Sequence, residues 1–596
     1  MERSNIPLIT CAILAAVTTG GPAYAFGIYS VELKNLLDLS QPQLDTLSSA
    51  YFCAGLFTWI PGLLVDRYGV RRAISCGGMM GATFMMAYWA VARQFIQLPS
   101  KACVIATLFC LGAGFCIANG LVIGAIYKIL VCSSTPTTKG SLVGVAKGYV
   151  GMGSGVYACL FQAMKTALHS KSDLDFLPMA AVIALMGAVV PALTLLPSQQ
   201  DTTSLWSLPR EKIDKTTKGH FTVLYMGLLA LAVMVMRTSL GELFAESWEG
   251  ESLRRTPSSH ISKGIVLLAL WLGPILFIRV LPTSSVAAPE DDSTVLSSGI
   301  YDVEDPNNNE LCEVDYPQSI TPGEHSPLLA KEAGDDRHSY VSQRTETTIA
   351  EDYAEKCSED SSMMMNGNYN LSQLLQTPHA WVLIWIALVI VGSGTMMTNN
   401  MGQMVESLAL MPQDTVTPAS MAIFSVAQAT SRVVTGAVSD AALARYGIPR
   451  PAFLIVASLI AAVAHSVLAL TDNHQEIAFL VGVTLSGVAF GMIWPLMVLI
   501  VGEVFGTAHM ATNYLFYDGG SSAFGTLLLS KFVTQEVYED HIDSSAETTC
   551  YGAECFQLSH WVVVALAMSC VVAALHLLQQ TREVYSNKAP SIVRKA

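Results

Sequence analysis

Residues 62–72 read Gly62-Leu-Leu64-Val-Asp66-Arg67-Tyr-Gly69-Val70-Arg71-Arg72 and connect two apolar runs, near residues 44–65 and 73–92. Each run is about as long as an α-helix must be to cross a hydrocarbon core about 30 Å thick. Of the 596 residues, 52% are hydrophobic and only 13% are charged, and the mean hydropathy is +0.45. A soluble domain carries about 25% charged residues. The composition therefore predicts an all-α polytopic membrane protein.

The apolar runs are grouped as six, two and six, which predicts about 14 spans. They lie near residues 6–31, 44–65, 73–92, 102–127, 141–164, 176–197, 220–241, 262–282, 379–400, 418–440, 452–471, 477–501, 510–532 and 558–578. We expect five parts: an N-terminal six-helix half (1–200), an inserted helical pair (201–282), an acidic loop (283–376), a C-terminal six-helix half (377–580) and a tail (581–596).

The orientation of such a chain follows from Lys and Arg in its short loops, which favour the cytosolic side. An even number of spans puts both termini on one side of the membrane. If that side is the inside, the short inner segments carry more Lys and Arg than the short outer segments. We therefore expect both termini and the acidic loop to be cytosolic.

The net charge of −14 arises almost entirely in residues 283–376. This segment is polar, acidic and poor in aromatic residues, a composition typical of disorder. An acidic segment of this kind argues against a nucleic-acid partner.

One short pattern in the acidic loop, Glu324-His-Ser-Pro-Leu328-Leu329, resembles the acidic dileucine signal that clathrin adaptors read on the way to lysosomes or vacuoles. The alternative is that this pattern is plain linker, because patterns of this length arise by chance. The resemblance favours a vacuolar or lysosomal membrane over the plasma membrane.

Cys550 and Cys555 fall in the long outer loop before the last span. That side is oxidising in secretory compartments, so these two residues are candidates for a disulfide bond. The neighbouring His541 and His560 fit no zinc spacing, and we expect neither a metal nor another cofactor. No nucleophile elbow, phosphate loop or metalloprotease motif occurs, so we do not expect an enzyme.

The loop quoted first resembles the signature loop of the major facilitator superfamily, Gly-x-Leu-x-Asp-Arg-x-Gly followed by basic residues. Val70 departs from the family, which usually has its first Arg there. An acidic side chain at Asp66 is suited to the N-terminus of a neighbouring helix, where negative charge is favoured. The resemblance implies a gating latch formed by Gly62, Asp66, Arg67, Gly69, Arg71 and Arg72.

The second half carries a partial echo of this loop in residues 431–440, which include Gly436 and Asp440. Corresponding loops in two six-helix halves are typical of internally repeated transporters. An ordinary inner loop would explain the Arg residues nearby, but not a Gly-x-x-x-Asp spacing in both halves. We therefore expect Gly436 and Asp440 to belong to the gate.

Further segments look like the nodulin-like branch of that superfamily, which is similar to fungal monocarboxylate transporter homologues. These segments are Tyr24-Ala-Phe-Gly27-Ile-Tyr29-Ser, Leu44-Asp-Thr-Leu-Ser, Val145-Ala-Lys147-Gly-Tyr-Val-Gly151, Thr398 to Leu408 and Cys550 to Phe556. The resemblance implies a major facilitator fold with an extra helical pair between the halves. The substrates of that branch are mostly undefined.

Ionisable groups inside membrane spans are costly, so each is a functional candidate. Lys147 lies about 9 Å along the fifth run at 1.5 Å per residue and would offer a cation to a carboxylate. The alternative is that its long side chain snorkels to the interface or pairs with an acid. Further candidates for substrate contact are Asn119, Tyr24, Asn399, Asn400 and Arg432, and Asp518 is a candidate for proton coupling. For each of these residues, structural hydrogen bonding is the alternative.

Together these features predict a monomeric secondary transporter of a small organic solute that works by alternating access. A monocarboxylate or an amino acid is the expected cargo, and protons are the expected coupling ion. This expectation rests on Lys147 and on family analogy. The rival interpretation is a receptor or scaffold that signals through the acidic loop. A channel is disfavoured because no filter-like loop is present.

Overall fold

The computed structural model describes residues 5–22, 26–135, 137–197, 218–248, 257–281, 368–411, 413–542 and 550–586. Tyr24, the pattern at 324–329 and nearly all of the acidic loop lie outside these residues. The regular elements in the described parts are all helices. Both expected six-helix halves fall in one compact unit, formed by Met1–Ser285 and Asn366–Ala596.

The first half consists of apolar helices with short connections. Its elements are α1 (Ile6–Gly20), η2 (Phe26–Ile28), α2 (Ser30–Leu36), α3 (Gln41–Ala54), η3 (Gly55–Phe57), α4 (Trp59–Tyr68), α5 (Val70–Ala92), α6 (Lys101–Cys132), α7 (Lys139–Leu168), η4 (Asp173–Asp175), α8 (Phe176–Ala184), the π-helix η5 (Leu185–Val189) and α9 (Val190–Leu195).

The inserted pair and the second half follow the same plan. Their elements are α11 (Lys218–Trp248), α12 (Pro257–Phe277), α14 (Leu371–Leu375), α15 (Pro378–Ser407), α16 (Gln413–Tyr446), α17 (Pro451–Ala469), α18 (Glu476–Val504), α19 (Met510–Gly525), the π-helix η7 (Thr526–Gln535), α20 (Glu536–Asp540), α21 (Glu554–Gln580) and α22 (Arg582–Ser586).

Nine helices in the described part of the chain are long and apolar enough to cross a membrane, by length and composition. One further pair, Thr46–Phe57 with Trp59–Tyr68, passes the same test together but bends by 51°. Pro61 lies in the first turn after this bend, where its missing N–H leaves no hydrogen bond back across the break. The all-α membrane fold is confirmed, whereas the count of 14 spans stays a prediction.

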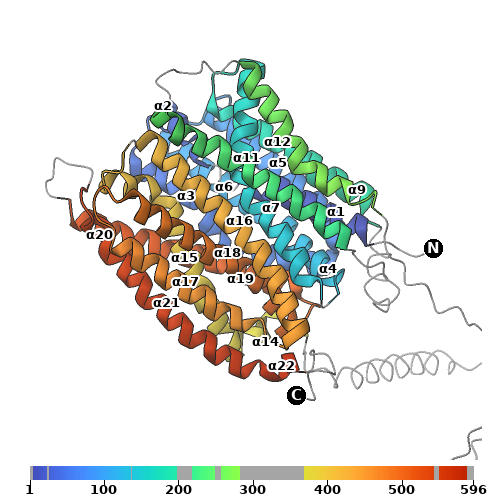
Figure 1. The fold of residues 1–596 in the computed structure, drawn as a ribbon. Coiled ribbons are helices and arrows are strands. Elements are labelled where there is room, and N and C mark those ends of the chain that lie inside the picture. The colour runs from blue at the N-terminus through green and yellow to red at the C-terminus, as the bar shows by residue number, and fades with distance from the viewer. Residues whose placement is uncertain are drawn as a thin grey trace, which may run out of the picture. The chain divides into compact units, whose positions relative to one another are not determined.

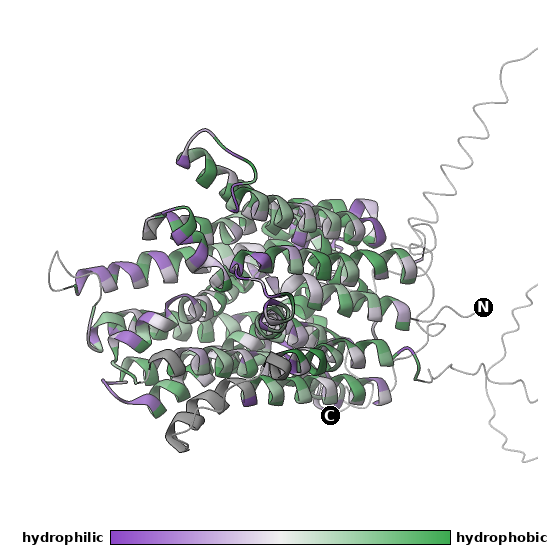
Figure 2. Ribbon diagram, turned by 90° about the horizontal axis from the view of Figure 1, so that it is seen from above, coloured by the Kyte–Doolittle hydropathy of each residue, from purple (hydrophilic) through white to green (hydrophobic). Residues whose placement is uncertain are grey.

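The helices lie side by side, with their loops gathered at two ends. Figure 1 shows α2 and α20 at one end of the bundle and α4 and α22 at the opposite end. We call these the α2/α20 end and the α4/α22 end. Figure 2 shows apolar residues predominating along the long helices and hydrophilic residues more often near the helix ends. This distribution is what a lipid environment requires.

The two halves meet along two helix pairs, α4 with α19 and α7 with α16. Glycines allow the close approach that such pairs need. A Cβ on Gly62 would lie 2.6 Å from the Cα of Thr512, and a Cβ on Gly140 would lie 2.4 Å from the carbonyl oxygen of Gly436. The inserted pair packs on α7, and α11 also contacts α16. Every element needed to position a site between the halves is therefore a tightly packed helix.

Candidate functional site

A cavity of about 850 Å³ lies between the halves and is lined by residues of both. Tyr29 and Tyr538 lie in its wall near the α2/α20 end. A smaller chamber of about 60 Å³ adjoins the cavity, and Tyr51 and Arg432 line both spaces. Lys147 and Asp518 line the smaller chamber. The charged candidates from the sequence therefore gather at one place between the halves.

Lys147 is buried and joins the two halves. Its Nζ donates to the hydroxyl of Tyr514 and lies 3.3 Å from Oδ1 of Asp518. Tyr514 in turn donates to the same carboxylate oxygen. Lys147 belongs to α7 in the first half, whereas Tyr514 and Asp518 lie one turn apart on α19 in the second half. The ammonium therefore points into the protein and pairs with an acid.

Three aromatic rings surround the same ammonium. The distance from Nζ of Lys147 to the ring centroid is 4.4 Å for Tyr127, 4.6 Å for Trp494 and 5.1 Å for Tyr514. A cation over an aromatic face is stabilised by the ring quadrupole, and more strongly where water is excluded. These rings offset part of the cost of burying the ammonium of Lys147.

Arg432 supplies a second buried cation, with only 2% of the residue exposed. Nη1 donates to the carbonyl oxygen of Lys147 at 2.9 Å, and Nη2 donates to Oε1 of Gln428 at 2.6 Å. Its guanidinium also lies 5.6 Å from the ring centroid of Trp494. The charged side chains that line the chamber are thus two cations and the single carboxylate of Asp518. Among the described residues, the chamber lining has a net charge of +1.

The asparagines predicted as substrate contacts fall on the same spaces. Nδ2 of Asn119 donates to the hydroxyl of Tyr51 at 2.8 Å, and its Oδ1 is one of the buried acceptors without a hydrogen-bond partner in the described chain. Asn399 and Asn400 line the large cavity and both donate to Oγ of Ser530 at 3.3 Å. Nδ2 of Asn400 also donates within its own helix. The structure thus places Asn119 at the small chamber and Asn399 and Asn400 at the large cavity. Part of their hydrogen-bonding capacity is used by other groups of the protein.

The loop quoted first closes the α4/α22 end through Asp66. Its carboxylate accepts hydrogen bonds from the backbone N–H of Ala511 (3.4 Å) and Thr512 (2.9 Å) and from the Thr512 hydroxyl (2.6 Å). It therefore caps the N-terminus of α19 in the opposite half, where negative charge is favoured. Nζ of Lys128 lies 2.6 Å from the same carboxylate and also donates to the carbonyl oxygen of Ala508. We call this set of contacts the Asp66 latch.

Asp440 makes the equivalent contact in the other direction. It accepts from the backbone N–H of Gly140 (2.9 Å) and Ser141 (2.7 Å) and so caps the N-terminus of α7 in the first half. Arg450 donates to Asp440 at 2.9 Å. Nε of Arg450 also lies 2.9 Å from both carboxylate oxygens of Glu503. We call this set of contacts the Asp440 latch.

The basic residues of the signature loop lie elsewhere. The guanidinium of Arg67 lies over the ring of Tyr68, and Arg71 donates to the carbonyl oxygen of Leu193 at the end of α9. Arg72 is exposed. The basic residues that do pair with the latch acids are Lys128 and Arg450, which sequence reasoning counted only as positive charges in inner loops. Tyr514 and Glu503 were also missed, although a carboxylate directly after an apolar run was a usable signal for Glu503.

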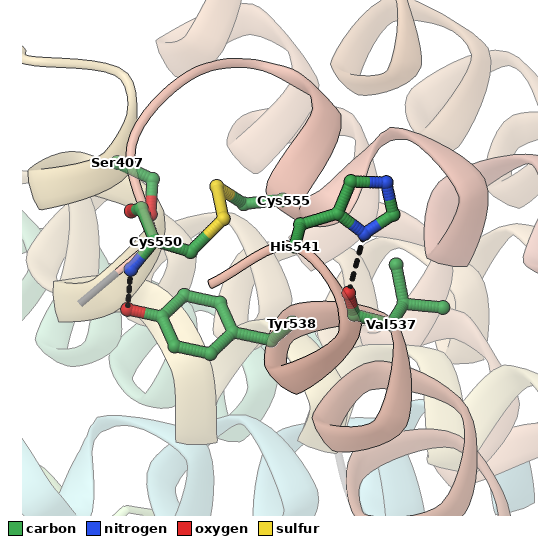
Figure 3. The surroundings of a disulfide bond; sticks show 6 residues. All are labelled: Ser407, Val537, Tyr538, His541, Cys550 and Cys555. Carbon is green, nitrogen blue, oxygen red and sulfur yellow. Dashed lines mark hydrogen bonds between the residues drawn. A yellow bond between two sulfur atoms is a disulfide. The ribbon is translucent and has the colours of Figure 1, made fainter. Parts of the chain in front are cut away.

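The structure joins Cys550 and Cys555 in a disulfide bond at the α2/α20 end. Figure 3 shows its surroundings, in which the N–H of Cys550 donates to the hydroxyl of Tyr538 at 3.0 Å. Oγ of Ser407 donates to the carbonyl oxygen of Cys550 at 2.8 Å. The turn therefore ties the ends of α15 and α20 to α21. Nδ1 of His541, which directly follows α20, is hydrogen-bonded to the carbonyl oxygen of Val537 in that helix. The described residues contain no cluster able to hold a metal ion.

A model of the Nodulin-like family matches residues 7–278 of the chain. The chain is 22% identical to Protein NUCLEAR FUSION DEFECTIVE 4 of Arabidopsis thaliana over 590 residues, which cover 97% of this chain and 89% of that protein. It is 25% identical over 219 residues to the Probable transporter MCH1 of Gibberella zeae, covering 30% of this chain and 37% of that protein.

Solved structures with the same fold include XylE, a major facilitator proton:xylose symporter. One XylE structure aligns over 95% of this chain and 94% of its own with 12% identity and a TM-score of 0.50. A double-tryptophan mutant of XylE aligns over 97% and 98% with 12% identity and a TM-score of 0.52. At this identity the likeness concerns the fold alone. Together with the family match, it confirms the resemblance predicted from the sequence.

Proposed function

We propose that this chain, a nodulin-like protein of the major facilitator superfamily, is a secondary active transporter that moves a small organic anion across a membrane by alternating access. The observation that carries the proposal is the Lys147–Asp518 pair, which joins the two halves where the large cavity narrows. A charged cargo can compete for one member of this pair. Because the pair joins the two halves, such competition also affects how the halves move.

The charge balance of the chamber favours an anion. Lys147 and Arg432 are two buried cations, and Asp518 is the one carboxylate among the described residues that line the chamber. Buried charges are stabilised by groups of opposite charge, so a carboxylate that enters between these two cations would be held by them. Arg offers such a group several N–H donors in a fixed geometry. A monocarboxylate, or the carboxylate of an amino acid, therefore fits this chamber.

The rest of the cargo would lie in the large cavity, whose wall is rich in aromatic residues. Tyr29, Tyr51, Phe52, Tyr88 and Phe115 belong to this wall. An organic body buries apolar area against such rings, while Asn399 and Asn400 offer hydrogen bonds. The volume of about 850 Å³ is within the range of small-molecule sites. The size of the cavity is compatible with a cargo larger than the carboxylate alone.

Proton coupling follows from competition for Lys147. A cargo carboxylate that binds Lys147 takes the place of the Asp518 carboxylate. Asp518 would then have lost its cation, and a proton taken up with the cargo would replace that cation. Tyr514 contacts both groups and holds them in register. In this mechanism one proton enters with each anion, and Asp518 carries it.

Alternating access is supported by the way the two ends differ. The Asp66 and Asp440 latches hold the halves together at the α4/α22 end. Residues near the α2/α20 end, in contrast, line the large cavity. With both termini in the cytosol, this conformation faces away from the cytosol. Opening the other way requires both latches to break.

The proposed location is a vacuolar or lysosomal membrane, and we propose a monomer divided into the five parts expected from the sequence. The support for the location is the Glu324–Leu329 pattern, which clathrin adaptors would read. Replacing Leu328 and Leu329 by Ala and following a fluorescent fusion tests this address. Redistribution of the fusion protein to the plasma membrane supports the sorting signal. An unchanged location of the fusion protein contradicts it.

Thermal-shift measurements test the transport site directly. A solute that binds only the folded protein raises Tm by mass action. At a solute concentration of 100 times Kd, the free energy of unfolding rises by about 2.7 kcal/mol. Purified wild type and Lys147→Ala are screened against monocarboxylates and amino acids. The control is Lys165→Ala, because Lys165 is also ion-paired on α7, with Asp173, but lines neither space.

We expect one class of carboxylate to stabilise the wild type and the control variant but not Lys147→Ala. If a carboxylate stabilises all three proteins equally, Lys147 is structural and the binding chemistry proposed here is wrong. If neutral solutes alone stabilise the wild type, the cargo is not an anion.

A further inference from the structure

The large cavity has two chemically different walls. Eight of the ten aromatic rings on its described wall come from the first half, and the two exceptions are Phe490 and Tyr538. All of the amide side chains on that wall come from the second half: Asn399, Asn400, Gln403, Gln428 and Gln535. The described part of the first-half wall contains neither an amide nor a charged side chain. A cargo in this cavity therefore meets rings on one side and hydrogen-bonding groups on the other.

Helical spacing brings the polar side chains of the second half to the cavity. On α15, Thr395, Asn399 and Gln403 follow one another at four-residue intervals and all line the cavity. On α16, Ser425 and Gln428 are three residues apart and also line it. Residues three and four apart lie on one face of an α-helix. Because α15 and α16 contact each other, their polar faces form one surface.

The π-helix η7 extends this polar surface toward the α2/α20 end. Thr526, Ser530, Thr534 and Tyr538 follow one another at four-residue intervals, and all four line the cavity. In an α-helix, with about 3.6 residues per turn, such a row drifts steadily around the helix axis. A π-helix has more residues per turn, so η7 followed by α20 offsets this drift. Short π-helical segments are frequent at functional sites, and this one keeps a row of hydroxyl groups facing the cavity.

Part of the polar surface is not occupied by other groups of the protein. Within the described chain, the side chains of Gln403 and Ser425 make no hydrogen bond. Gln428 accepts from Arg432 through Oε1, which leaves its NH₂ group available at the cavity. An amide offers both an acceptor oxygen and two N–H donors, so it can bond two neighbouring hydroxyl groups of one ligand. These side chains are therefore available to a cargo that carries hydroxyl groups.

We propose that the cargo is a polyhydroxylated carboxylate, such as a sugar acid. The C–H groups of such a ring are apolar and pack against the aromatic rings of the first half. Its hydroxyl groups bond the amides and hydroxyls of the second half, while its carboxylate reaches Arg432, which lines both spaces. The inference rests on the anion transport proposed above and names the part of the cargo that lies outside the small chamber.

Three probes with a six-membered ring separate the hydroxyl groups from the carboxylate. Glucuronate carries both, glucose carries hydroxyl groups without a carboxylate, and cyclohexanecarboxylate carries a carboxylate without hydroxyl groups. Each is titrated against the purified full-length chain, with Tm as the readout. The variants Gln403→Leu and Ser425→Ala remove wall groups whose side chains bond no other described residue. The matched control is Gln97→Leu, because Gln97 is exposed in a loop and does not line the cavity.

We expect glucuronate to bind the wild type about tenfold more tightly than either other probe, which is roughly the factor that one or two hydrogen bonds supply. Gln403→Leu and Ser425→Ala should each weaken glucuronate binding several-fold and leave cyclohexanecarboxylate binding unchanged. Gln97→Leu should bind all three probes as the wild type does.

The other outcomes distinguish the two proposals. Equal affinity for glucuronate and cyclohexanecarboxylate would overturn the role of the hydroxyl groups and leave the anion transporter standing. Equal affinity for glucuronate and glucose would support the polar wall and contradict an anionic cargo. Unchanged glucuronate binding in both wall variants, or a Tm that none of the three probes raises, would overturn the inference.

Discussion

Gly140 on α7 and Gly436 on α16 approach each other so closely that neither position has room for a side chain. A Cβ on Gly436 would lie 2.2 Å from the carbonyl oxygen of Gly140. Two helices from opposite halves are therefore in backbone contact next to the Asp440 latch. In the alternating access proposed above, this contact is lost when the halves separate at the α4/α22 end.

The glycine contact predicts that Gly436→Ala opposes closure. The added methyl meets backbone atoms that cannot move aside, so the halves must separate by about the size of a methyl group. We expect faster amide exchange at residues 140–141 and a loss of transport, with a cost of about 1–3 kcal/mol to the closed state. Gly273→Ala is the matched control, because nothing lies within 4 Å of its Cβ position. Equal exchange in the two variants would contradict this account.

Removing one member of the central pair should cost stability. Lys147→Ala leaves Asp518 without its cation, and Asp518 is 18% exposed in its side chain. Breaking a fully buried pair costs about 3–5 kcal/mol, and partial exposure reduces this to roughly 2–4 kcal/mol. The double variant Lys147→Ala with Asp518→Ala should recover most of the lost Tm without recovering anion binding. A double variant no more stable than Lys147→Ala would show that the pair is not coupled.

Each latch acid should contribute to the closed state by itself. Asp66→Asn and Asp440→Asn keep the size of the side chain but replace an acceptor oxygen by an NH₂ group, which faces N–H donors. We expect each to weaken closure by about 1–3 kcal/mol, seen as lower affinity for cargo added from the α2/α20 side. Asp472→Asn serves as control, because Asp472 is exposed in a loop at that other end. Transport that is unaffected by either latch variant would argue against rocking halves.

The disulfide at the α2/α20 end should stabilise the cavity wall. Cys550 and Cys555 are five residues apart, and closing so short a loop is worth about 2 kcal/mol in the chain-entropy description. Replacing both by Ser frees the turn that holds Ser407 and Tyr538, and Tyr538 lines the cavity. We expect a lower Tm and a weaker carboxylate-induced shift, which reductant reproduces in wild type. Reductant should have no further effect on the double Ser variant.

Deleting the acidic loop separates the transporter from the rival receptor. The deletion should end before residue 366, because the N–H of Tyr369 donates to the carbonyl oxygen of Phe505 and Tyr369 accepts from Asn513. A chain lacking residues 290–365 should still bind and move its cargo, although in a different membrane if the dileucine pattern is read. If the shortened chain still moves its cargo but no longer restores the phenotype of cells that lack the protein, signalling through the loop is favoured.

Local sequence patterns predicted the positions of single residues, but they did not predict which residues pair with one another. The role of Asp66 at a helix N-terminus could be anticipated, because an acid after an apolar run and before a turn has few other uses. The position of Lys147 inside a long helix also followed from its place in an apolar run. Its partners did not, since Asp518 lies 371 residues away and only the meeting of the two halves brings the two together.

The sequence also could not assign the basic residues of the signature loop. Arg67, Arg71 and Arg72 were expected in the latch because the signature loop that this segment resembles carries basic residues there. A helix presents neighbours in sequence on different faces, so adjacency does not bring them to the same contact. Lys128 was available instead from a different helix, α6, and is buried beside the acid.

The two latches are reciprocal: the first half caps a helix of the second through Asp66, and the second caps the equivalent helix of the first through Asp440. In a dimer of identical six-helix chains, one acid and one helix start per copy would make both contacts, as any isologous interface does. This single chain makes both contacts, although its two halves differ in sequence. Lys128 pairs with the acid of one contact and Arg450 with the acid of the other. Substitutions can therefore change the strength of one contact without altering the other.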